Sequence, residues 1–212
     1  MSEPITLQQL AGQRGPADHV VRDQIIQAAN DHFRHYGYAK TTVADLASAI
    51  GFSKAYIYKF FPSKQAIGEA IGIECVSTIL AAATSEVDGA NTASEKLQRL
   101  FRTVTAKCLE LLFEDRKLYE MVTCAIVEQW SVPVIYEARL STLLRGVIEE
   151  GRASGEFERN IPLDETCRAI LCAMSPFIHP IALEFNLENL PQRSAELTRL
   201  VLRSLAPEAD RP

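Results

Sequence analysis

Apolar residues recur at helical spacing in almost every segment of this 212-residue chain, and no segment alternates apolar and polar residues as a half-buried strand would. The pattern predicts an all-α protein of about nine helices, whose ends are marked by glycine, proline and capping residues. The expected helices are a first one from about Val21 to Tyr36, then Val43–Ile50, Lys54–Phe61, a long helix from Ser63 to about Ala83, one after Thr92, one from about Leu118, Ser131–Gly151, Leu163–Phe185 and Pro191–Leu205.

Two of the expected helices are short and are separated by Gly51. Thr42 can cap the first of them, with Asp45 three residues on in a position to complete a capping box, and Ser53 can cap the second. Glycine at position 51 allows the left-handed backbone of a tight turn. Two short helices joined in this way form a helix-turn-helix, whose second helix enters the major groove of DNA.

The apolar spacing within this motif assigns Leu46, Ile57 and Phe61 to the contacts that hold the helices together. The remaining side chains of the second helix are of types that bond phosphates or approach base edges closely. Helix N-termini favour phosphates, and a phosphate would also relieve an unfavourable lysine at the start of the next helix. The candidate DNA-binding residues are therefore Thr42, Ser53, Lys54, Ala55, Tyr56, Tyr58, Lys59 and Lys64.

The charge distribution agrees with a DNA-binding N-terminal part. The net charge is −5, which by itself argues against a nucleic-acid partner. Residues 14–64, however, carry seven basic and four acidic side chains, whereas residues 65–212 carry fifteen and twenty-two. A locally basic segment on an acidic body is consistent with a domain that contacts DNA joined to one that does not.

Residues 41–67, TTVADLASAIGFSKAYIYKFFPSKQAI, resemble the DNA-binding signature of the TetR/AcrR family of bacterial regulators. The shared features are a threonine pair, a glycine turn, a serine cap, a tyrosine, an aromatic pair and a lysine that opens the fourth helix. The resemblance covers about residues 20–75. Ala55 departs from it, because many members carry glycine there. The resemblance implies phosphate contacts by Thr42, Tyr58 and Lys64, and base or groove contacts by Lys54, Ala55, Tyr56 and Lys59.

The family's architecture implies three parts in this chain. Residues 1–16 would form a flexible arm and residues 17–63 the helix-turn-helix domain, while residues 64–212 would form a helical domain for effector binding and dimerisation. The last two long helices carry apolar stripes that would build a symmetric interface in a homodimer. The residues expected at that interface are Ile170, Leu171, Leu197, Leu200, Val201 and Leu205.

Aromatic, methionine and polar residues of the C-terminal part are candidates for an effector cavity, although such residues at helical spacing also occur in ordinary cores. Trp130 follows polar Glu128 and Gln129, which predicts a ring at the edge of the apolar body. His179 lies between Pro176 and Pro180, two prolines that should kink or break the helix; the freed carbonyls would face a cavity, or the kink would only shape the dimer surface. The candidate effector-binding residues are Phe113, Tyr119, Cys124, Trp130, Tyr136, Met174, Phe177 and His179.

We find no pattern that predicts catalysis, a cofactor or a metal site. The five cysteines form no CxxC pair and have no histidine at ligand spacing, so reduced core thiols are expected, and a redox switch stays open. The sequence has no nucleophile elbow and no glycine-rich phosphate loop. No apolar run approaches the roughly 20 residues of a membrane span, and the start at Met1 lacks secretion-signal features, so a cytoplasmic protein is expected.

Together with the family resemblance, these patterns predict a repressor that binds a palindromic double-stranded DNA operator as a homodimer and is released by a small hydrophobic or amphipathic effector. An activator or a ligand-independent regulator on the same fold remains an alternative. A small helical enzyme and a purely helical interaction module are further alternatives. Salt-dependent retention on DNA separates the regulators from the last two classes.

Overall fold

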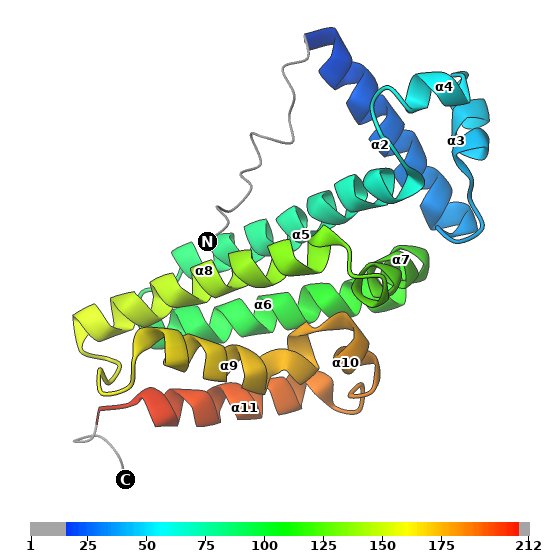
Figure 1. Ribbon diagram of the computed structural model, residues 1–212. Coiled ribbons are helices and arrows are strands. Elements are labelled where there is room, and N and C mark those ends of the chain that lie inside the picture. Colours follow the sequence, from blue (N-terminus) through cyan, green and yellow to red (C-terminus); the bar gives the residue numbers. More distant parts are fainter. Residues whose placement is uncertain (1–15, 208–212) are drawn as a thin grey trace. The chain divides into compact units, whose positions relative to one another are not determined.

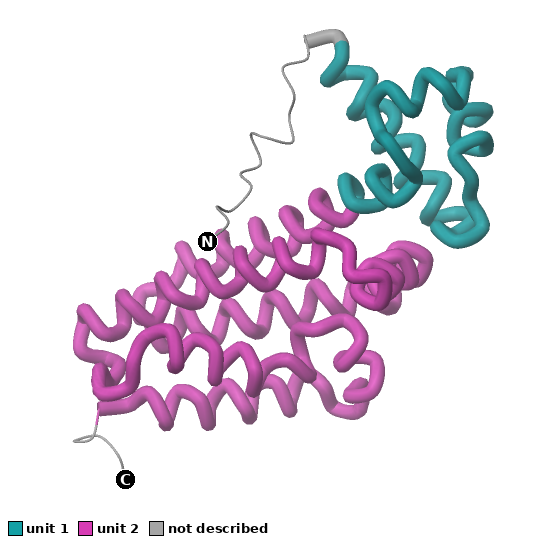
Figure 2. The backbone as a smooth tube through the Cα atoms, in the orientation of Figure 1, with its two compact units in different colours: residues 1–71 teal, residues 72–212 magenta. Residues whose placement is uncertain are grey.

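The computed structural model describes residues 16–207, and within that range it contains ten α-helices and no β-strand (Figure 1). The expected all-α class is therefore confirmed. The chain divides into two compact units, residues 1–71 and residues 72–212 (Figure 2). This division falls inside helix α5 (Lys64–Asp88), whose first residue is also where the sequence placed the start of the effector domain. The expected arm of residues 1–16 lies outside the described residues except for Pro16, where α2 begins.

The first unit contains α2 (Pro16–Tyr36), α3 (Val43–Ala49), α4 (Lys54–Ile57) and the beginning of α5. On α2, apolar side chains four residues apart form one buried face, as expected for an amphipathic helix. That face packs with apolar residues of the following helices into a single core. The core residues include Ile25, Ala29, Phe33, Leu46, Ile57, Phe61 and Ile67.

Helix α4 is shorter than the predicted Lys54–Phe61. Beyond Ile57 the chain continues as tight turns, in which the Lys59 N–H donates to the Tyr56 carbonyl at 3.2 Å and the Phe60 N–H donates to the Ile57 carbonyl at 2.9 Å. These are the i to i+3 bonds with which helix ends commonly tighten. Among residues 58–61, only Lys59 and Phe60 make bonds of this type, because the Phe61 N–H donates to the Ile57 carbonyl at 3.0 Å, as in an α-helix.

The second unit is a helical bundle around α6 (Ala93–Glu114), which packs against five other helices of the unit (Figure 1). Its core is built from apolar residues of every long helix, among them Leu97, Leu100, Phe101 and Val104 of α6. The helices around α6 are α7 (Arg116–Val127), α8 (Ser131–Ser154), α9 (Leu163–Ile178), α10 (Pro180–Glu184) and α11 (Leu190–Leu205).

Two helix boundaries in this unit differ from the prediction. Helix α5 extends to Asp88 instead of about Ala83. The helix expected over Leu163–Phe185 is broken into α9 and α10 at His179, whose backbone is extended (φ −99°, ψ 121°). Pro180 explains the break, because it has no N–H to donate and restricts the preceding residue to extended backbone. The break raises the number of helices from the expected nine to ten.

Helix α5 is long and apolar enough to cross a membrane by length and composition alone. Half of its most apolar window is buried inside the protein, as in the core helix of a soluble protein. Several of its side chains, including Val76, Leu80 and Ala83, belong to the core of the second unit. Packing in this core therefore accounts for part of the apolar character of α5.

Candidate nucleic-acid interface and effector cavity

The helix-turn-helix begins with the capping box that the sequence predicts. The Asp45 N–H donates to the Thr42 hydroxyl oxygen at 3.2 Å, while the N–H and the hydroxyl of Thr42 donate to the Asp45 carboxylate at 2.8 and 2.7 Å. The bond from the Thr42 hydroxyl, and to a smaller extent the bond from its backbone N–H, lower the pKa of the Asp45 carboxyl below its ordinary value. The Thr42 side chain is thus exposed but already engaged in fixing the start of α3.

The turn between α3 and α4 requires Gly51. Its φ is +71°, a left-handed conformation that side chains other than glycine rarely adopt. The next residue, Phe52, donates its N–H to the Ala47 carbonyl at 2.9 Å and closes the turn. Ser53 then caps α4 by accepting the Tyr56 N–H at 3.1 Å. Every residue that the sequence assigned to this turn has the expected role.

Four of the candidate DNA-binding side chains, Lys54, Ala55, Tyr58 and Lys59, are exposed on α4 and the turn that follows it. The Lys54 ammonium lies 5.8 Å from the centre of the Tyr58 ring, so this pair shares one surface. The buried Ile57 fixes which side of α4 faces outward. The resulting surface offers two positive charges and a phenol hydroxyl, which suit phosphates and base edges.

Tyr56 has a different environment from the four exposed residues. Its side chain is half-buried and packs edge to face against Phe52 and Phe60, with ring centres 5.0 and 5.4 Å apart. The Lys59 ammonium lies 5.5 Å from the centre of the Tyr56 ring. The structure therefore gives Tyr56 a supporting position beneath Lys59, whereas the sequence grouped it with the outward residues.

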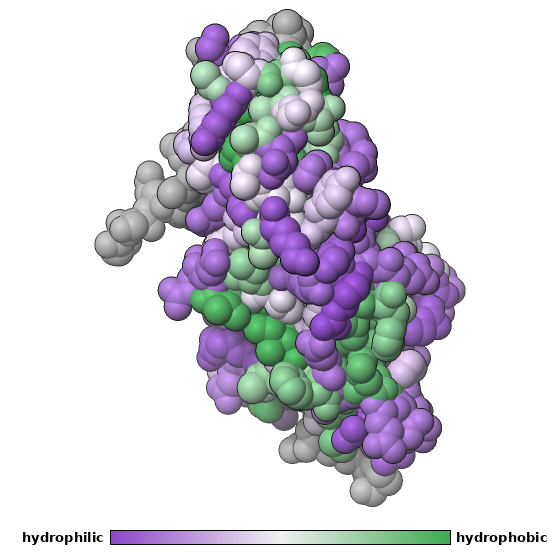
Figure 3. Space-filling model, turned by 90° about the vertical axis from the view of Figure 1, so that its right-hand side faces the viewer, coloured by the Kyte–Doolittle hydropathy of each residue, from purple (hydrophilic) through white to green (hydrophobic). Residues whose placement is uncertain are grey.

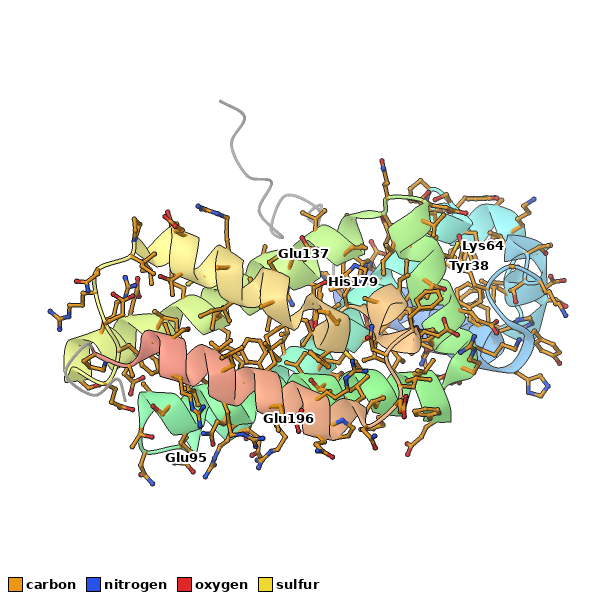
Figure 4. All side chains as sticks on the ribbon, turned by 90° about the horizontal axis from the view of Figure 1, so that it is seen from below. Tyr38, Lys64, Glu95, Glu137, His179 and Glu196 are labelled. Carbon is orange, nitrogen blue, oxygen red and sulfur yellow. The ribbon has the colours of Figure 1, made fainter. Side chains whose placement is uncertain are left out.

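Lys64 is engaged inside the first unit. Its ammonium donates to the carbonyls of Tyr38 and Thr41, both at 3.0 Å, and lies 4.2 Å from the centre of the Tyr38 ring (Figure 4). These carbonyls compensate the unfavourable position of a lysine at a helix start, a role that the sequence assigned to a DNA phosphate. The local sequence gave no sign of this, because Tyr38 lies 26 residues earlier in the chain.

Replacing Lys64 by alanine should therefore destabilise the protein. The change leaves two carbonyls without their charged donor, and hydrogen bonds to charged groups contribute about 1.5–3 kcal/mol each. Because the side chain is only half-buried, we expect the free energy of unfolding to fall by about 1–3 kcal/mol, measured by urea denaturation. Lys40→Ala, which removes the same charge from an exposed site in the α2–α3 loop, is the control. Equal stability of the two variants would contradict the internal role.

A cavity of about 50 Å³ lies within the second unit, enclosed by α5, α6, α7, α8 and the link between α9 and α10. Its wall is almost entirely apolar, with Tyr136, Glu137 and His179 contributing the polar side chains other than thiols. The same three residues also line a groove of about 240 Å³ between α8 and α9. Figure 4 shows Glu137 and His179 close together in this region. The remaining residues of the cavity wall are Gly72, Cys75, Val76, Ile79, Cys108, Leu111, Val122, Ala125, Ile126, Val132, Pro133 and Pro180.

Of the eight candidate effector residues, the structure brings Tyr136 and His179 to the cavity wall. Phe113 is 67% exposed on the end of α6, and Cys124 is half-buried away from the cavity lining. The sequence analysis did not identify the small and aliphatic residues that form most of the cavity wall. They differ from core residues only in facing the cavity, which the sequence does not reveal. The other four candidates, Tyr119, Trp130, Met174 and Phe177, are buried in the core.

The prediction for Trp130 was wrong. The ring is 2% exposed instead of lying at the edge of the body, and its indole N–H donates to the Glu128 carboxylate at 2.9 Å. The physical reason is the backbone of Gln129, which has a left-handed φ of +57°. This conformation ends α7 and returns the chain, so that the Trp130 N–H donates to the Ala125 carbonyl at 2.8 Å and the ring enters the core.

Trp130→Phe should consequently lower stability without changing effector affinity. A smaller ring leaves an unfilled volume and loses the bond to Glu128, which together cost about 1–3 kcal/mol. Thermal or urea denaturation measures the first effect. The second is measured by titrating a compound that releases DNA, with Tyr136→Leu as the comparison at the cavity wall. A loss of effector affinity in Trp130→Phe as large as that in Tyr136→Leu would show that the ring belongs to the site.

At the break between α9 and α10, two backbone carbonyls accept hydrogen bonds from tyrosine hydroxyls. Tyr136 donates to the Ile178 carbonyl at 3.0 Å, and Tyr119 donates to the Pro180 carbonyl at 2.6 Å. The Cys108 thiol also points to the Ile178 carbonyl, at 3.7 Å. Burial raises the pKa of Tyr119 and of Cys108 to about 12, and that of Tyr136 well above its ordinary value. These groups are therefore neutral donors near pH 7, and Cys108 is not an activated thiol.

Within residues 16–207, no group of three or more histidine, cysteine, aspartate or glutamate side chains is placed to hold a metal ion. The cysteines among these residues carry free thiols. Cys108 and Cys167 are buried, and desolvation raises the pKa of both. Burial therefore leaves the Cys108 and Cys167 thiols protonated and not activated near pH 7.

Three of the six residues expected at a dimer interface pack inside their own chain. Ile170, Val201 and Leu205 are 5, 7 and 3% exposed, because α9 and α11 use these side chains to pack against each other and against α6. Leu171 and Leu197 are half-buried, and Leu200 is 63% exposed. Other apolar side chains also reach the surface of this unit, shown in green in the lower half of Figure 3. The large exposed ones include Phe113, Val127, Val134, Phe185 and Leu187.

Sequence profiles of two domains match the chain. The profile described as bacterial regulatory proteins, tetR family, matches residues 25–71, and that described as tetracyclin repressor-like, C-terminal domain, matches residues 93–198. No curated protein sequence gives a significant match. The first profile covers the helix-turn-helix, and the second begins at the first residue of α6 and ends within α11.

Solved structures with similar folds include bacterial transcriptional regulators. FadR of Thermus thermophilus in complex with lauroyl-CoA is 20% identical, with a TM-score of 0.65 over 90% of this chain and 98% of its own. FadR of Bacillus subtilis in complex with stearoyl-CoA is 21% identical, with a TM-score of 0.62 over 86% of this chain and 98% of its own. A TetR/AcrR-family transcriptional regulator of Thermobifida fusca is 25% identical, with a TM-score of 0.56 over 86% and 96%.

Proposed function

The chain belongs to the TetR family of bacterial regulatory proteins, and from this premise we propose that it is a cytoplasmic transcriptional repressor. As a homodimer it binds a palindromic DNA operator, and a small hydrophobic or amphipathic effector releases it. The observation that carries the proposal is the exposed surface of Lys54, Tyr58 and Lys59 on a capped helix-turn-helix, in a domain that the family profile matches. The three structures described above are regulators, which favours this function over an enzyme.

In this proposal the outward residues of α4 and of the turn that follows it contact DNA. Lys54, Tyr58 and Lys59 bond phosphates and base edges in the major groove, and Ala55 permits close approach of the helix. Tyr56 supports this surface from beneath. Two such surfaces in a dimer would bind half-sites about 34–36 Å apart, one turn of the double helix. Thr42 and Ser53 flank the surface and complete the set of proposed contacts.

The proposed effector site is the apolar cavity of the second unit. Its volume of about 50 Å³ is smaller than the ~150 Å³ cavity known to hold benzene, so most ligands would have to displace its walls. Such a displacement gives an effector different affinities for two conformations, with a typical coupling of about 1–3 kcal/mol. The complexes of the two FadR proteins with acyl-CoA support an effector with a large apolar part. Its polar part would face Tyr136, Glu137 and His179, where the cavity adjoins the α8–α9 groove.

Transcription in vitro tests the proposed function. A duplex that the protein enriches from a random-sequence pool is placed across the start of a promoter, and transcript is measured with increasing protein. We expect transcript to fall, and to recover when lauroyl-CoA or another compound that stabilises the protein thermally is added. A rise in transcript would identify an activator. No enrichment of any duplex would contradict DNA recognition itself.

A further inference from the structure

A further recess lies between α6 and α11, away from the proposed effector cavity and from the α8–α9 groove. Its volume is about 400 Å³, within the range of about 300–1,000 Å³ that is typical of small-molecule sites. It shares no lining residue with the cavity enclosed by α5, α6, α7 and α8. We call it the α6–α11 groove, and Figure 4 shows the two helices that form it, seen from below. Its lining residues are Gln98, Arg102, Thr105, Ala106 and Leu109 of α6, and Pro191, Ser194, Ala195, Thr198 and Arg199 of α11.

The charge of this groove is positive although the chain as a whole is acidic. Arg102 and Arg199 line it from its two helices, and no carboxylate is among its lining residues. Arg102 pairs with Glu86 at 3.3 Å, but the two side chains are 70 and 47% exposed, and such surface pairs contribute little. Arg199 makes no hydrogen bond or ion pair with any residue of the described range 16–207. Both guanidinium groups are thus available to an anion.

The groove also contains buried hydroxyl groups. Thr105 and Ser194, each 3% exposed, have their hydroxyl oxygens 3.2 Å apart. One of these hydroxyls donates to the other, so the accepting hydroxyl keeps a hydrogen that it can donate into the groove. Thr198 donates instead to the Ser194 carbonyl at 2.8 Å. Buried polar groups normally find a partner, and an acceptor bound in the groove would provide one.

The rest of the wall is nonpolar. Ala106 and Leu109 on α6 face Pro191 and Ala195 on α11, and the small side chains leave the groove open. An inorganic ion would use only the arginines and the hydroxyls. A ligand with an apolar body would also cover the nonpolar wall, which is favourable at about 25 cal/mol per Å².

We propose that the α6–α11 groove binds a small organic anion. Its carboxylate or phosphate would lie between Arg102 and Arg199, whose planar guanidinium groups match the oxygens of such acids. Its apolar body would lie against Leu109 and Pro191. The site is separate from the surface proposed for dimers, because Leu200 is two residues from Thr198 and therefore points to the opposite side of α11.

Isothermal titration calorimetry of the full-length protein with phenyl phosphate tests the proposal. We expect one site per chain, with an affinity that falls about tenfold for each arginine replaced and about a hundredfold in Arg102→Gln/Arg199→Gln. Arg168→Gln, which removes one charge from the exposed side of α9, should bind as the wild type does. Benzyl alcohol and inorganic phosphate should each bind at least about tenfold more weakly, because each lacks half of the proposed recognition.

A second variant blocks the groove without changing its charge. Ala195 is exposed on α11, so Ala195→Phe should fold normally, as checked by its melting temperature, and should lose phenyl phosphate binding. Wild-type affinity in both Ala195→Phe and the double arginine variant would overturn the site. No saturable binding at millimolar phenyl phosphate would overturn it as well. Equal affinity for inorganic phosphate would overturn the organic part of the proposal. None of these outcomes depends on whether the protein represses transcription.

Discussion

A variant in which Lys54, Tyr58 and Lys59 are all replaced by alanine should bind its operator at least about a hundredfold more weakly than the wild type, since contacts of this kind contribute about 1–3 kcal/mol each. The fold should persist, because the three side chains are exposed and Ile57 and Phe61 still anchor the segment in the core. Fluorescence anisotropy with a duplex selected from a random pool measures the affinity, and circular dichroism with thermal melting measures the fold.

The control for this variant removes two positive charges elsewhere. Lys107→Ala/Arg168→Ala changes the net charge by the same amount on the second unit, and we expect it to bind DNA with nearly wild-type affinity. If the control loses as much affinity as the α4 variant, the effect is one of overall charge. Undiminished binding by the α4 variant would exclude this surface from the DNA interface.

Two neighbouring residues of α11 should respond in opposite ways to the same change. Val201 is 7% exposed, and a glutamate there would bury an unpaired charge, which costs roughly 3–5 kcal/mol and should unfold much of the second unit. Leu200 is 63% exposed, so Leu200→Glu should keep the fold. If the outward side of α11 forms the dimer, Leu200→Glu should instead yield monomers that bind a palindromic duplex far more weakly.

Sedimentation velocity and thermal denaturation distinguish these outcomes. We expect the wild type to be a dimer at micromolar concentration, Leu200→Glu to be a folded monomer, and Val201→Glu to melt much earlier than either. A folded Val201→Glu with wild-type stability would contradict its place in the core. A wild-type monomer, or a Leu200→Glu dimer, would contradict the proposed interface.

The sequence predicted well those features that depend on residues close together in the chain. The capping box of Thr42 and Asp45, the turn at Gly51 and the cap at Ser53 all form as expected. Each rests on a hydrogen bond or a backbone preference within a few residues. Proline at position 180 likewise signalled the break after α9, although the sequence left open whether the helix would kink or end.

Features that depend on tertiary contacts were predicted poorly. Polar neighbours suggested an exposed edge for Trp130, but the left-handed backbone of Gln129 directs the Trp130 ring into the core. Glutamine has no strong preference for that backbone conformation, so the sequence does not predict it. The apolar stripe of α11 was visible, but periodicity does not say whether it faces the same chain or a second one. Val201 and Leu205 face the same chain. The contact between Lys64 and Tyr38 was also not predicted, because the two residues are 26 positions apart in the sequence.

The most direct test of the account is the salt dependence of DNA binding. We predict that the logarithm of the wild-type association constant for its selected duplex falls linearly with the logarithm of the salt concentration, with a slope of about −0.9 for each phosphate contacted. Replacing Lys54 and Lys59 should make this slope shallower by roughly one to two phosphate contacts. Binding that is absent at low salt, or that does not change with salt, would contradict a DNA-binding function for this protein.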